Sequence, residues 1–548
     1  MRVLPRSPWT AYRLFLAKLL IAASALGLGA CASLPDNVER PVSHAFNAPG
    51  TTPLGRLVVA SQPAGASGSG FALLGQADSA YTSRISMVDA AQKSLDLQYY
   101  AIKQDASTDA LLARVRAAAQ RGVRVRILLD DLNASGRDAH VLRLMADRNI
   151  EIRMFNPLPG MRGSMLGRIL GSLGDVDRIQ QRMHNKVFIA DGALAITGGR
   201  NIGDAYFGQG QDSNFVDLDI LAAGAIVGDL SRSFDAYWNN KLAYPVESLL
   251  SQSEMEKLLG PVPEVAVPKK EVSSEAGTTA QDKTPAPKPP LPDTPSTIDE
   301  GIRTGRLALT WAPALMLVDK PGKLDPDKEA PPEETQDTLV DGLLRLMARA
   351  RGDLLIVSPY FVPGPRMMEE FAALRKRNVR VRVLTNSLAS NDAPIAHVGY
   401  ARYRHDLIRM GVELYEMRAE SQAAGGAFGS SGLGASADSR ASLHAKTIVM
   451  DDRILVVGSM NLDLRSQLQN SEVALLIRSV SLSRAARDMI EPTLERDAWR
   501  MALDGNGKLL WRAPPKSGLE DERSEPGAST GLQIMLKLVS PFAPDEML

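Results

Sequence analysis

The sequence of 548 residues contains a single cysteine, Cys31, which excludes an internal disulfide framework and a cysteine-rich zinc site. Its 63 basic and 63 acidic residues balance, so the overall charge gives no reason to expect a polyanionic partner such as nucleic acid. Aromatic residues make up only 5 % of the chain, beside 44 glycines and 34 prolines, so part of the length is expected to be linker. The composition is otherwise that of a globular protein, and the length predicts at least two domains.

Long hydrophobic runs are also missing. The apolar run at residues 19–30 has 12 residues, too few to span a bilayer as a mature helix, and it follows a basic segment, as in an export signal. Leu28-Gly29-Ala30-Cys31 matches the lipobox of bacterial lipoproteins, whose cysteine thiol takes a diacylglyceryl group. We therefore predict a signal peptide (1–30) and a lipid anchor on Cys31; the alternative is a free cysteine after an ordinary signal peptide. Ala32 predicts sorting to the periplasmic face of the outer membrane.

Composition also divides the rest of the chain. Residues 31–70 are polar and rich in Pro, Gly and Ser, which predicts a flexible tether. Residues 261–296 carry nine prolines and almost no large apolar residues, which predicts an exposed linker, whereas the Gly/Ala/Ser tract at 421–440 predicts a mobile loop. Elsewhere helix-like and strand-like segments alternate, as in α/β domains. The predicted units are the signal (1–30), the tether (31–70), a first α/β half (71–259), the linker (260–304), a second α/β half (305–512) and a tail (513–548).

The tail ends in an apolar segment, GLQIMLKLV at 531–539. Two interpretations are open for it. It is either an amphipathic segment that contacts a membrane or a helix that packs on the second half.

The two α/β halves look like copies of each other. RGVRVRILLD at 121–130 matches RNVRVRVLTN at 377–386, and LQYY at 97–100 matches VSPY at 357–360. The decisive match is a gap-free pattern, His-x-Lys-x4-Asp-x6-Gly-[Gly/Ser]-x-Asn, which occurs twice and uses two of only six histidines. Its residues are His184, Lys186, Asp191 and Asn201 in the first copy, and His444, Lys446, Asp451, Ser459 and Asn461 in the second.

The pattern has a direct physical interpretation. Histidine and lysine two residues apart on a strand project from the same face, so each copy presents an imidazole beside an ammonium group. The aspartate stands at a turn signal, at the far end of a hairpin, which favours a structural role for it. The return strand ends at the serine and asparagine positions, close to the histidine and lysine. Two lysines, two asparagines and nearby backbone donors predict a pocket for a phosphate oxyanion.

Two imidazoles at one phosphate suggest covalent catalysis, in which one attacks phosphorus and the other moves protons to and from the alcohols. A carboxylate behind each imidazole would fix its tautomer. The candidates are Glu472, 28 residues after His444, and Asp217, at the aligned place after His184; the alternative is that both only stabilise the surface or the fold. We expect no cofactor and no metal, because lysines stand where a metal enzyme would place ligands.

With these motifs the sequence resembles the phospholipase D superfamily, whose HKD motifs are these residues. Further stretches resemble bacterial cardiolipin synthases of the C type, namely 182–207, 356–364, 391–416 and 443–466. The resemblance implies two α/β sandwich halves related by a pseudo-two-fold axis, with the active site at their interface. It implies as catalytic residues His184, Lys186, Asp191, His444, Lys446 and Asp451.

The resemblance also implies a metal-independent transfer through a phosphohistidine. A phosphatidyl group would leave phosphatidylglycerol or phosphatidylethanolamine for a second phosphatidylglycerol, giving cardiolipin. His184 is assigned the attack and His444 the acid/base role, with the reverse open. The alternatives are a phospholipase that uses water as acceptor and, less in keeping with the neutral composition, a nucleic-acid phosphodiesterase. Four more residues either line the entrance for the headgroup or, as we favour, belong to a packed helix: Asp392, His397, Tyr400 and His405.

Overall fold

The structure is a computed structural model, and it describes residues 34–132, 139–159, 176–259, 296–325, 338–420 and 440–542. The predicted signal peptide with Cys31, most of the predicted linker and nearly all of the predicted loop at 421–440 lie outside these residues.

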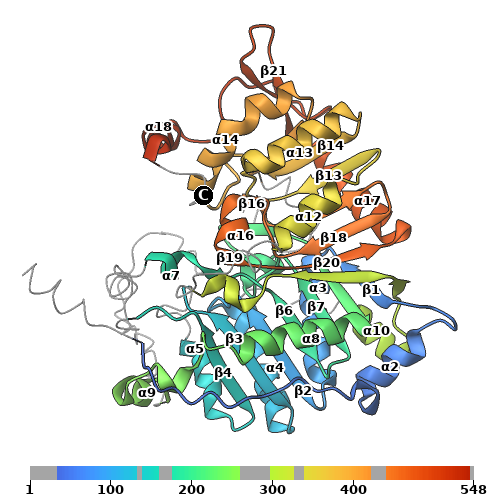
Figure 1. The fold of residues 1–548 in the computed structure, drawn as a ribbon, viewed down its shortest axis with the longest axis vertical. Coiled ribbons are helices and arrows are strands. Elements are labelled where there is room, and N and C mark those ends of the chain that lie inside the picture. Colours follow the sequence, from blue (N-terminus) through green and yellow to red (C-terminus); the bar gives the residue numbers. More distant parts are fainter. Residues whose placement is uncertain are drawn as a thin grey trace, which may run out of the picture.

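Two large mixed sheets, one in each half, form the framework of the described chain (Figure 1). The first sheet has the strand order β10 (Ala243–Pro245), β4 (Ile150–Phe155), β3 (Arg124–Asp130), β2 (Ser94–Tyr99), β6 (Val187–Ala190), β7 (Leu194–Gly198), β9 (Asp219–Gly224), β1 (Ser69–Leu74) and β11 (Thr310–Ala312). The second has the order β12 (Ala314–Val318), β20 (Val473–Arg478), β18 (Ile454–Gly458), β17 (Thr447–Met450), β13 (Asp353–Val357), β14 (Arg380–Asn386), β15 (Glu413–Met417), β21 (Ala498–Leu503) and β22 (Leu509–Arg512).

The two sheets share one topology. In the first, β2, β3 and β4 run parallel, and the hairpin of β6 and β7 joins the edge of β2 in antiparallel fashion. In the second, β13, β14 and β15 are parallel, and the hairpin of β17 and β18 joins β13 in the same way. The predicted repeat is therefore a structural repeat of two α/β halves.

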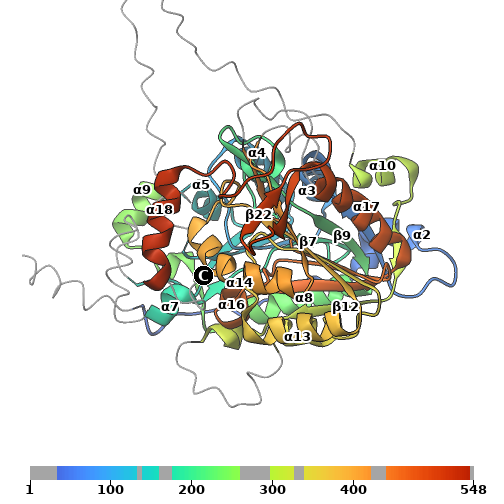
Figure 2. The same ribbon diagram turned by 90° about the horizontal axis from the view of Figure 1, so that it is seen from above.

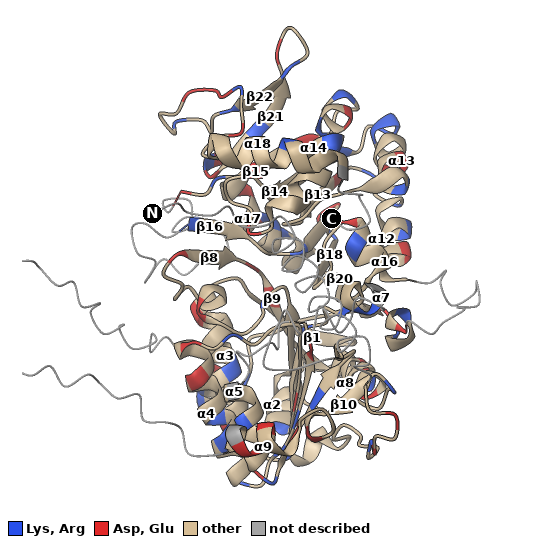
Figure 3. Ribbon diagram, turned by 90° about the vertical axis from the view of Figure 1, so that its left-hand side faces the viewer, with Lys and Arg blue, Asp and Glu red and all other residues tan. Residues whose placement is uncertain are grey.

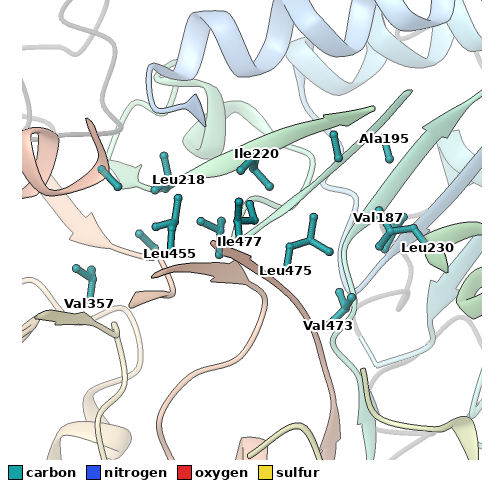
Figure 4. Packing of buried hydrophobic residues seen from close by; sticks show 14 of the residues in the cluster. Val187, Ala195, Leu218, Ile220, Leu230, Val357, Leu455, Val473, Leu475 and Ile477 are labelled. Atoms are coloured by element: carbon teal, nitrogen blue, oxygen red, sulfur yellow. The ribbon is translucent and has the colours of Figure 1, made fainter. Parts of the chain in front are cut away.

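Helices complete the layers on both sides of each sheet. The outer faces carry α3 (Ala77–Ala90) and α4 (Ala106–Gln120) in the first half, and α12 (Leu339–Met347), α13 (Gly364–Lys376) and α14 (Pro394–Arg409) in the second. Between the sheets lie α8 (Ala225–Trp238) and α17 (Val480–Arg496). One hydrophobic core runs through this central layer, where Leu218 and Ile220 of the first half meet Leu455 and Ile477 of the second (Figure 4). Burial of this apolar surface holds the halves together.

The prediction of a flexible tether over 31–70 is wrong for its described part. Residues 53–61 form helix α2 (Pro53–Ser61), whose Leu54 and Val58 are buried in the core of the first half. The preceding segment lies against the same half, where the Arg40 Nε donates to the Ala243 carbonyl over 3.2 Å and the Ala45 N–H donates to Asp235 over 2.8 Å. Polar composition concealed this, because a nine-residue helix needs only a few apolar residues on one side to dock.

The second half begins at Ala314 rather than at residue 305. Helix α10 (Thr297–Thr304) buries Ile298 in the core of the first half, and β11 pairs with β1. Pro313 then leads into β12, which pairs with β20 of the second sheet. Composition could not place this crossing, because both flanking strands are short and similar in sequence character.

The described part of the tail contains helix α18 (Thr530–Val539), whose Leu536 packs against Val398 of α14 and against Leu388 before that helix. Nowhere in the described ranges is a helix long and apolar enough to cross a membrane.

Candidate active site

Two short parallel ladders connect the halves, and each ends directly at predicted site residues. Strand β5 (Arg182–Met183) of the first half pairs with β19 (Asn470–Ser471) of the second, so His184 and Glu472 follow side by side. Strand β8 (Ser213–Val216) pairs with β16 (Arg440–Leu443), so Asp217 and His444 follow side by side. Both ladders are extended by a backbone bond of the histidine itself: the His184 N–H donates to the Ser471 carbonyl and the His444 N–H to the Val216 carbonyl.

The carboxylates are consequently exchanged between the halves. His184 Nδ1 lies 2.9 and 3.0 Å from the two carboxylate oxygens of Glu472, and His444 Nδ1 lies 2.7 Å from Asp217 Oδ2. All four side chains are buried. Each imidazole thus receives its carboxylate from the opposite half of the chain, which the sequence alignment of the two copies did not reveal.

The charges in these pairs follow from their surroundings. Burial opposes ionisation of Glu472, but the neighbouring His184 and Lys186 outweigh it and lower the pKa of that carboxyl below its usual value. The pKa of Asp217 is lowered likewise, against burial, by His444 and Lys446. Ionised carboxylates accept the Nδ1–H of each ring, which leaves the Nε2 lone pair of each imidazole free.

Burial also favours the neutral form of both imidazoles. It lowers the pKa of His184 to about 4, with Glu472 opposing and Lys186 reinforcing the shift. Burial, reinforced by Lys446, lowers the pKa of His444 as well. A neutral imidazole with a free Nε2 is the form that can attack phosphorus.

The two lysines stand beside the histidines as predicted. Lys186 Nζ donates to the His184 carbonyl over 2.9 Å, and Lys446 Nζ donates to the His444 carbonyl. Burial lowers the pKa of Lys186 to about 7 and that of Lys446 to about 8. A nearby anion would favour the charged forms of both lysines.

A cavity of about 400 Å³ opens at this junction and is lined by residues of both halves. His184, His444, Asn201 and Asn461 all face it. The Asn201 Nδ2 donates to the Tyr206 hydroxyl over 2.9 Å, and Asn461 Oδ1 is buried without a partner among the described residues. The cavity therefore brings the predicted imidazoles and amides to one place.

The predicted phosphate-binding role of Ser459 does not match its contact, because Ser459 Oγ donates to Glu472. It supports the carboxylate that orients His184. The first copy has Gly199 at this position, and a Cβ there would lie 2.1 Å from Asp217 Oδ1. The shorter aspartate approaches the strand so closely that only glycine fits.

Asp191 and Asp451 lie outside the cavity, so the catalytic role that the resemblance implied for them is not what the structure shows. Each sits at its hairpin turn with a left-handed backbone, at φ 52° and 53°. The Asp191 carboxylate accepts the backbone N–H groups of residues 92–94, and the Asp451 carboxylate accepts those of residues 351–353. Asp191 thus fixes its hairpin to the start of β2, and Asp451 fixes its hairpin to the start of β13. This is the structural role that the hairpin position favoured.

Sequence reasoning missed several cavity residues. Tyr100 and Tyr360 line it, and the Tyr100 ring packs edge-on against His184 at 4.9 Å between centroids. The signal was available, since both tyrosines end the matching segments LQYY and VSPY. Lys103, Tyr206 and Arg465 also line the cavity and carried no such signal.

Of the residues in the stretch 391–416 that could line the entrance, some lie at the cavity and others pack elsewhere. Asp392 lines the cavity and accepts from the Tyr360 hydroxyl over 2.8 Å. His397 and Tyr400 instead pack in a buried cluster with Arg404 and Glu416, away from the cavity lining. No group of three or more metal-ligating side chains occurs in the part of the chain that the structure describes.

Comparison with known proteins adds the family. A family model described as cardiolipin synthase, PLD-like domain, matches residues 85–238 and 343–493, which are one segment in each half. The chain belongs to this family. Cardiolipin synthase C of Escherichia coli (strain K12) is 35 % identical over 465 residues, 84 % of this chain and 92 % of that protein. Cardiolipin synthase B of Salmonella typhi is 23 % identical over 447 residues, 82 % of this chain and 86 % of that protein.

The fold of this phospholipase D-like chain also has a solved counterpart. The crystal structure of a phosphatidylserine synthase from Haemophilus influenzae Rd KW20 superposes with a TM-score of 0.54 at 14 % identity, covering 87 % of this chain and 95 % of that one. Two phospholipase D-like α/β halves, the predicted fold class, are thereby confirmed. Family and motif together make the protein a phospholipase D-like phosphatidyltransferase.

Proposed function

We propose that the protein makes cardiolipin by transferring a phosphatidyl group to phosphatidylglycerol through a phosphohistidine. The observation that carries the proposal is the pair of buried imidazoles that open onto one cavity, each oriented by a carboxylate of the other half. A lysine donates to the backbone carbonyl of each histidine. The similarity to proteins named cardiolipin synthase indicates the substrate class.

In the first step Nε2 of His184 attacks the phosphorus of the donor lipid and forms a P–N bond. The P–O bond to the headgroup alcohol breaks, and His444, protonated once the phosphate anion is bound, gives that alkoxide a proton. Lys186 and Lys446 stabilise the charge that develops on the phosphoryl oxygens.

In the second step a hydroxyl of phosphatidylglycerol gives its proton to His444 and attacks phosphorus. The P–N bond breaks, and His184 regains its lone pair. With phosphatidylglycerol as donor, the products are cardiolipin and glycerol.

The test is mass spectrometry of lipids after incubation of the purified protein with isotopically labelled phosphatidylglycerol, with and without phosphatidylethanolamine. We expect labelled cardiolipin. The alcohol released identifies the donor: glycerol comes from phosphatidylglycerol and ethanolamine from phosphatidylethanolamine. Phosphatidic acid as the sole product would make the protein a hydrolase instead. EDTA should leave the rate unchanged.

The role of His184 is tested by substitution. His184→Ala should abolish both transfer and hydrolysis, because no covalent intermediate can form. His444→Ala should slow turnover about 10²- to 10⁴-fold while permitting slow build-up of a phosphoenzyme. His405→Ala, outside the cavity lining, is the matched control and should retain the wild-type rate. A phosphoenzyme trapped at His444 would reverse the two roles.

We further propose that the protein is anchored in the bacterial cell envelope by a diacylglyceryl group on Cys31, at the periplasmic face of the outer membrane. The lipobox supports this. Palmitate labelling of the wild type that is lost in Cys31→Ser is the expected result, and equal labelling of both would contradict it.

A further inference from the structure

Helix α18 presents an apolar surface for which the described chain offers no cover. Ile534, Met535 and Leu538 are 55 %, 51 % and 69 % exposed, and their spacing of i, i+1 and i+4 places them on one side of the helix. Leu536 is buried against the domain, so the helix is docked by one face and leaves the other in solvent. The helix carries one lysine, Lys537, and no acidic residue.

The helix is fixed to the wall of the active-site cavity. It packs on α14, whose first turn supplies Ile395 and Ala396 to the cavity lining. The Arg402 guanidinium on α14 donates to the Ser540 carbonyl just after α18, over 2.6 Å. Before α18, Glu525 pairs with Arg404 of α14 in a buried contact. Because of these ties, α18 keeps a set position relative to the cavity.

Two further exposed apolar side chains lie on helices that contribute to the cavity lining. Ile395, which lines it, is half exposed. Leu468 is also half exposed and belongs to α16 (Leu464–Leu468), the helix that supplies Arg465 to the lining. In two perpendicular views α18, α14 and α16 lie toward one side of the molecule, the side on which Figure 3 looks (Figures 1 and 2).

The start of the described chain lies on that same side in both views (Figures 1 and 2). Cys31 lies three positions before Leu34, and an extended chain over three positions spans about 10 Å. A lipid on Cys31 would therefore enter a bilayer close to this side.

We infer that α18, together with Ile395 and Leu468, forms a docking face that seats on a phospholipid bilayer and brings the cavity mouth to the level of the headgroups. The inference rests on the proposed function, since a transferase for diacyl lipids must reach a phosphate whose acyl chains stay in the membrane. Exposed apolar side chains enter the boundary between headgroups and acyl chains, and Lys537 suits an anionic lipid such as phosphatidylglycerol.

The contact is tested directly with a fluorescent label. In the full chain with Cys31→Ser, an environment-sensitive fluorophore is placed through Leu538→Cys or, as a control, through Leu315→Cys on β12. Leu315 is 64 % exposed, and β12 lies on the opposite side from α18 in Figure 2. On vesicles of phosphatidylethanolamine and phosphatidylglycerol, brominated acyl chains should quench the label at 538 several-fold more than the label at 315. Equal quenching would overturn the inference.

A second measurement separates docking from catalysis. The triple variant Ile534→Ser, Met535→Ser, Leu538→Ser leaves the buried Leu536 in place, and its matched control is Leu315→Ser. The triple variant should lose about ten-fold or more of the transfer rate on vesicles, because apolar burial in the interface is lost, yet keep the wild-type rate on short-chain phosphatidylglycerol dispersed below its micelle concentration.

Each other outcome has one meaning. Equal loss on vesicles and on dispersed lipid would show that α18 acts through packing and would overturn the inference. Concentration-dependent dimers that the triple variant abolishes would assign the face to a second copy of this chain and also overturn it. Selective quenching of the label at 538, together with a wild-type protein that transfers no phosphatidyl group, would uphold docking and reject the proposed function.

Discussion

At His184, a carboxylate from the other half of the chain decides which ring nitrogen is free. Glu472 holds the Nδ1–H, so the lone pair at Nε2 is the one available to the cavity. Ser459 in turn donates to Glu472, which fixes the carboxylate. The free nitrogen of His184 is thus set by a series of three side chains, of which only His184 itself lines the cavity.

Replacing that carboxylate should therefore lower the catalytic rate while substrate binding is largely retained. Glu472→Gln offers an amide that can donate to the ring, which stabilises the wrong tautomer, and we expect kcat to fall about 10²- to 10⁴-fold with a smaller change in KM. Steady-state kinetics on dispersed phosphatidylglycerol measure this. Glu495→Gln on the exposed side of α17 is the control. A kcat within three-fold of wild type in Glu472→Gln would contradict the orienting role.

The pH dependence follows from the shifted groups. His184, with its pKa lowered to about 4, is neutral above that pH, whereas Lys186 and Lys446, lowered to about 7 and 8, lose their protons as pH rises. Attack needs a neutral imidazole and phosphate binding needs charged lysines. We expect kcat/KM to rise through about pH 4 and to fall above about pH 7.

The alkaline limb can be assigned by substitution. Lys186→Arg stays charged over the whole range, so its alkaline limb should move up towards pH 8, where Lys446 still titrates, whatever its maximal rate. An unchanged limb would show that another group controls it.

At the scale of elements, the hairpins and the two ladders have different roles in building the site. The hairpins β6–β7 and β17–β18 present histidine and lysine at one end and a structural aspartate at the other. The ladders β5–β19 and β8–β16 then set each histidine beside its carboxylate.

Loss of a hairpin aspartate should affect stability and not chemistry. Asp191→Ala leaves the backbone N–H groups of residues 92–94 without their acceptor, and we expect the free energy of unfolding to fall by about 2–4 kcal/mol. Denaturant unfolding measures it, and the fraction that stays folded should transfer phosphatidyl groups normally. Lys186→Ala should show the opposite pattern, with lost activity and a smaller change in stability. Asp488→Ala, on an exposed position of α17, is the control for both.

The sequence predicted those parts of the site that depend on local periodicity. The shared face of His184 and Lys186 and the hairpin position of Asp191 follow from the alternation of strand residues and from turn signals. The exchange of Glu472 and Asp217 between the halves could not be predicted, because it depends on the register of ladders two to four residues long that carry no pattern of their own. Helix α2 was missed for a related reason, since few apolar residues in a polar segment suffice to dock it.

At the scale of the whole molecule, the halves adhere through a shared core, and the backbone passes from one to the other at Pro313. The described chain stops after α9 (Gln252–Leu259) and resumes at α10, which packs on the far side of the same first half (Figure 1). Residues 260–295 join these two points of the first half in the sequence.

Nicking this connection should consequently be harmless, while shortening it should not. A protease site placed between residues 265 and 295 and then cleaved should leave the two fragments associated on gel filtration, with at least about half of the uncleaved activity, because α10, β11 and the central core still hold the second fragment to the first. Deleting residues 265–295 should instead displace α10 and β11, since the few residues left reach only about 20 Å. Separation of the two fragments after cleavage would show that the covalent link at residues 260–295 is needed to hold the site together.

The exchanged carboxylates also constrain how such a chain can descend from a shorter one. His184 and Glu472 are 288 positions apart, and His444 and Asp217 are 227 apart, yet each residue is useless to the histidine encoded in its own half. A gene for one half alone would therefore give a working enzyme only as a two-fold symmetric homodimer, in which each subunit supplies the carboxylate that orients the histidine of the other. Fusion of two such genes keeps the two halves in one polypeptide. A mutation of the carboxylate in either half then disables the histidine of the other half, so both halves are selected together.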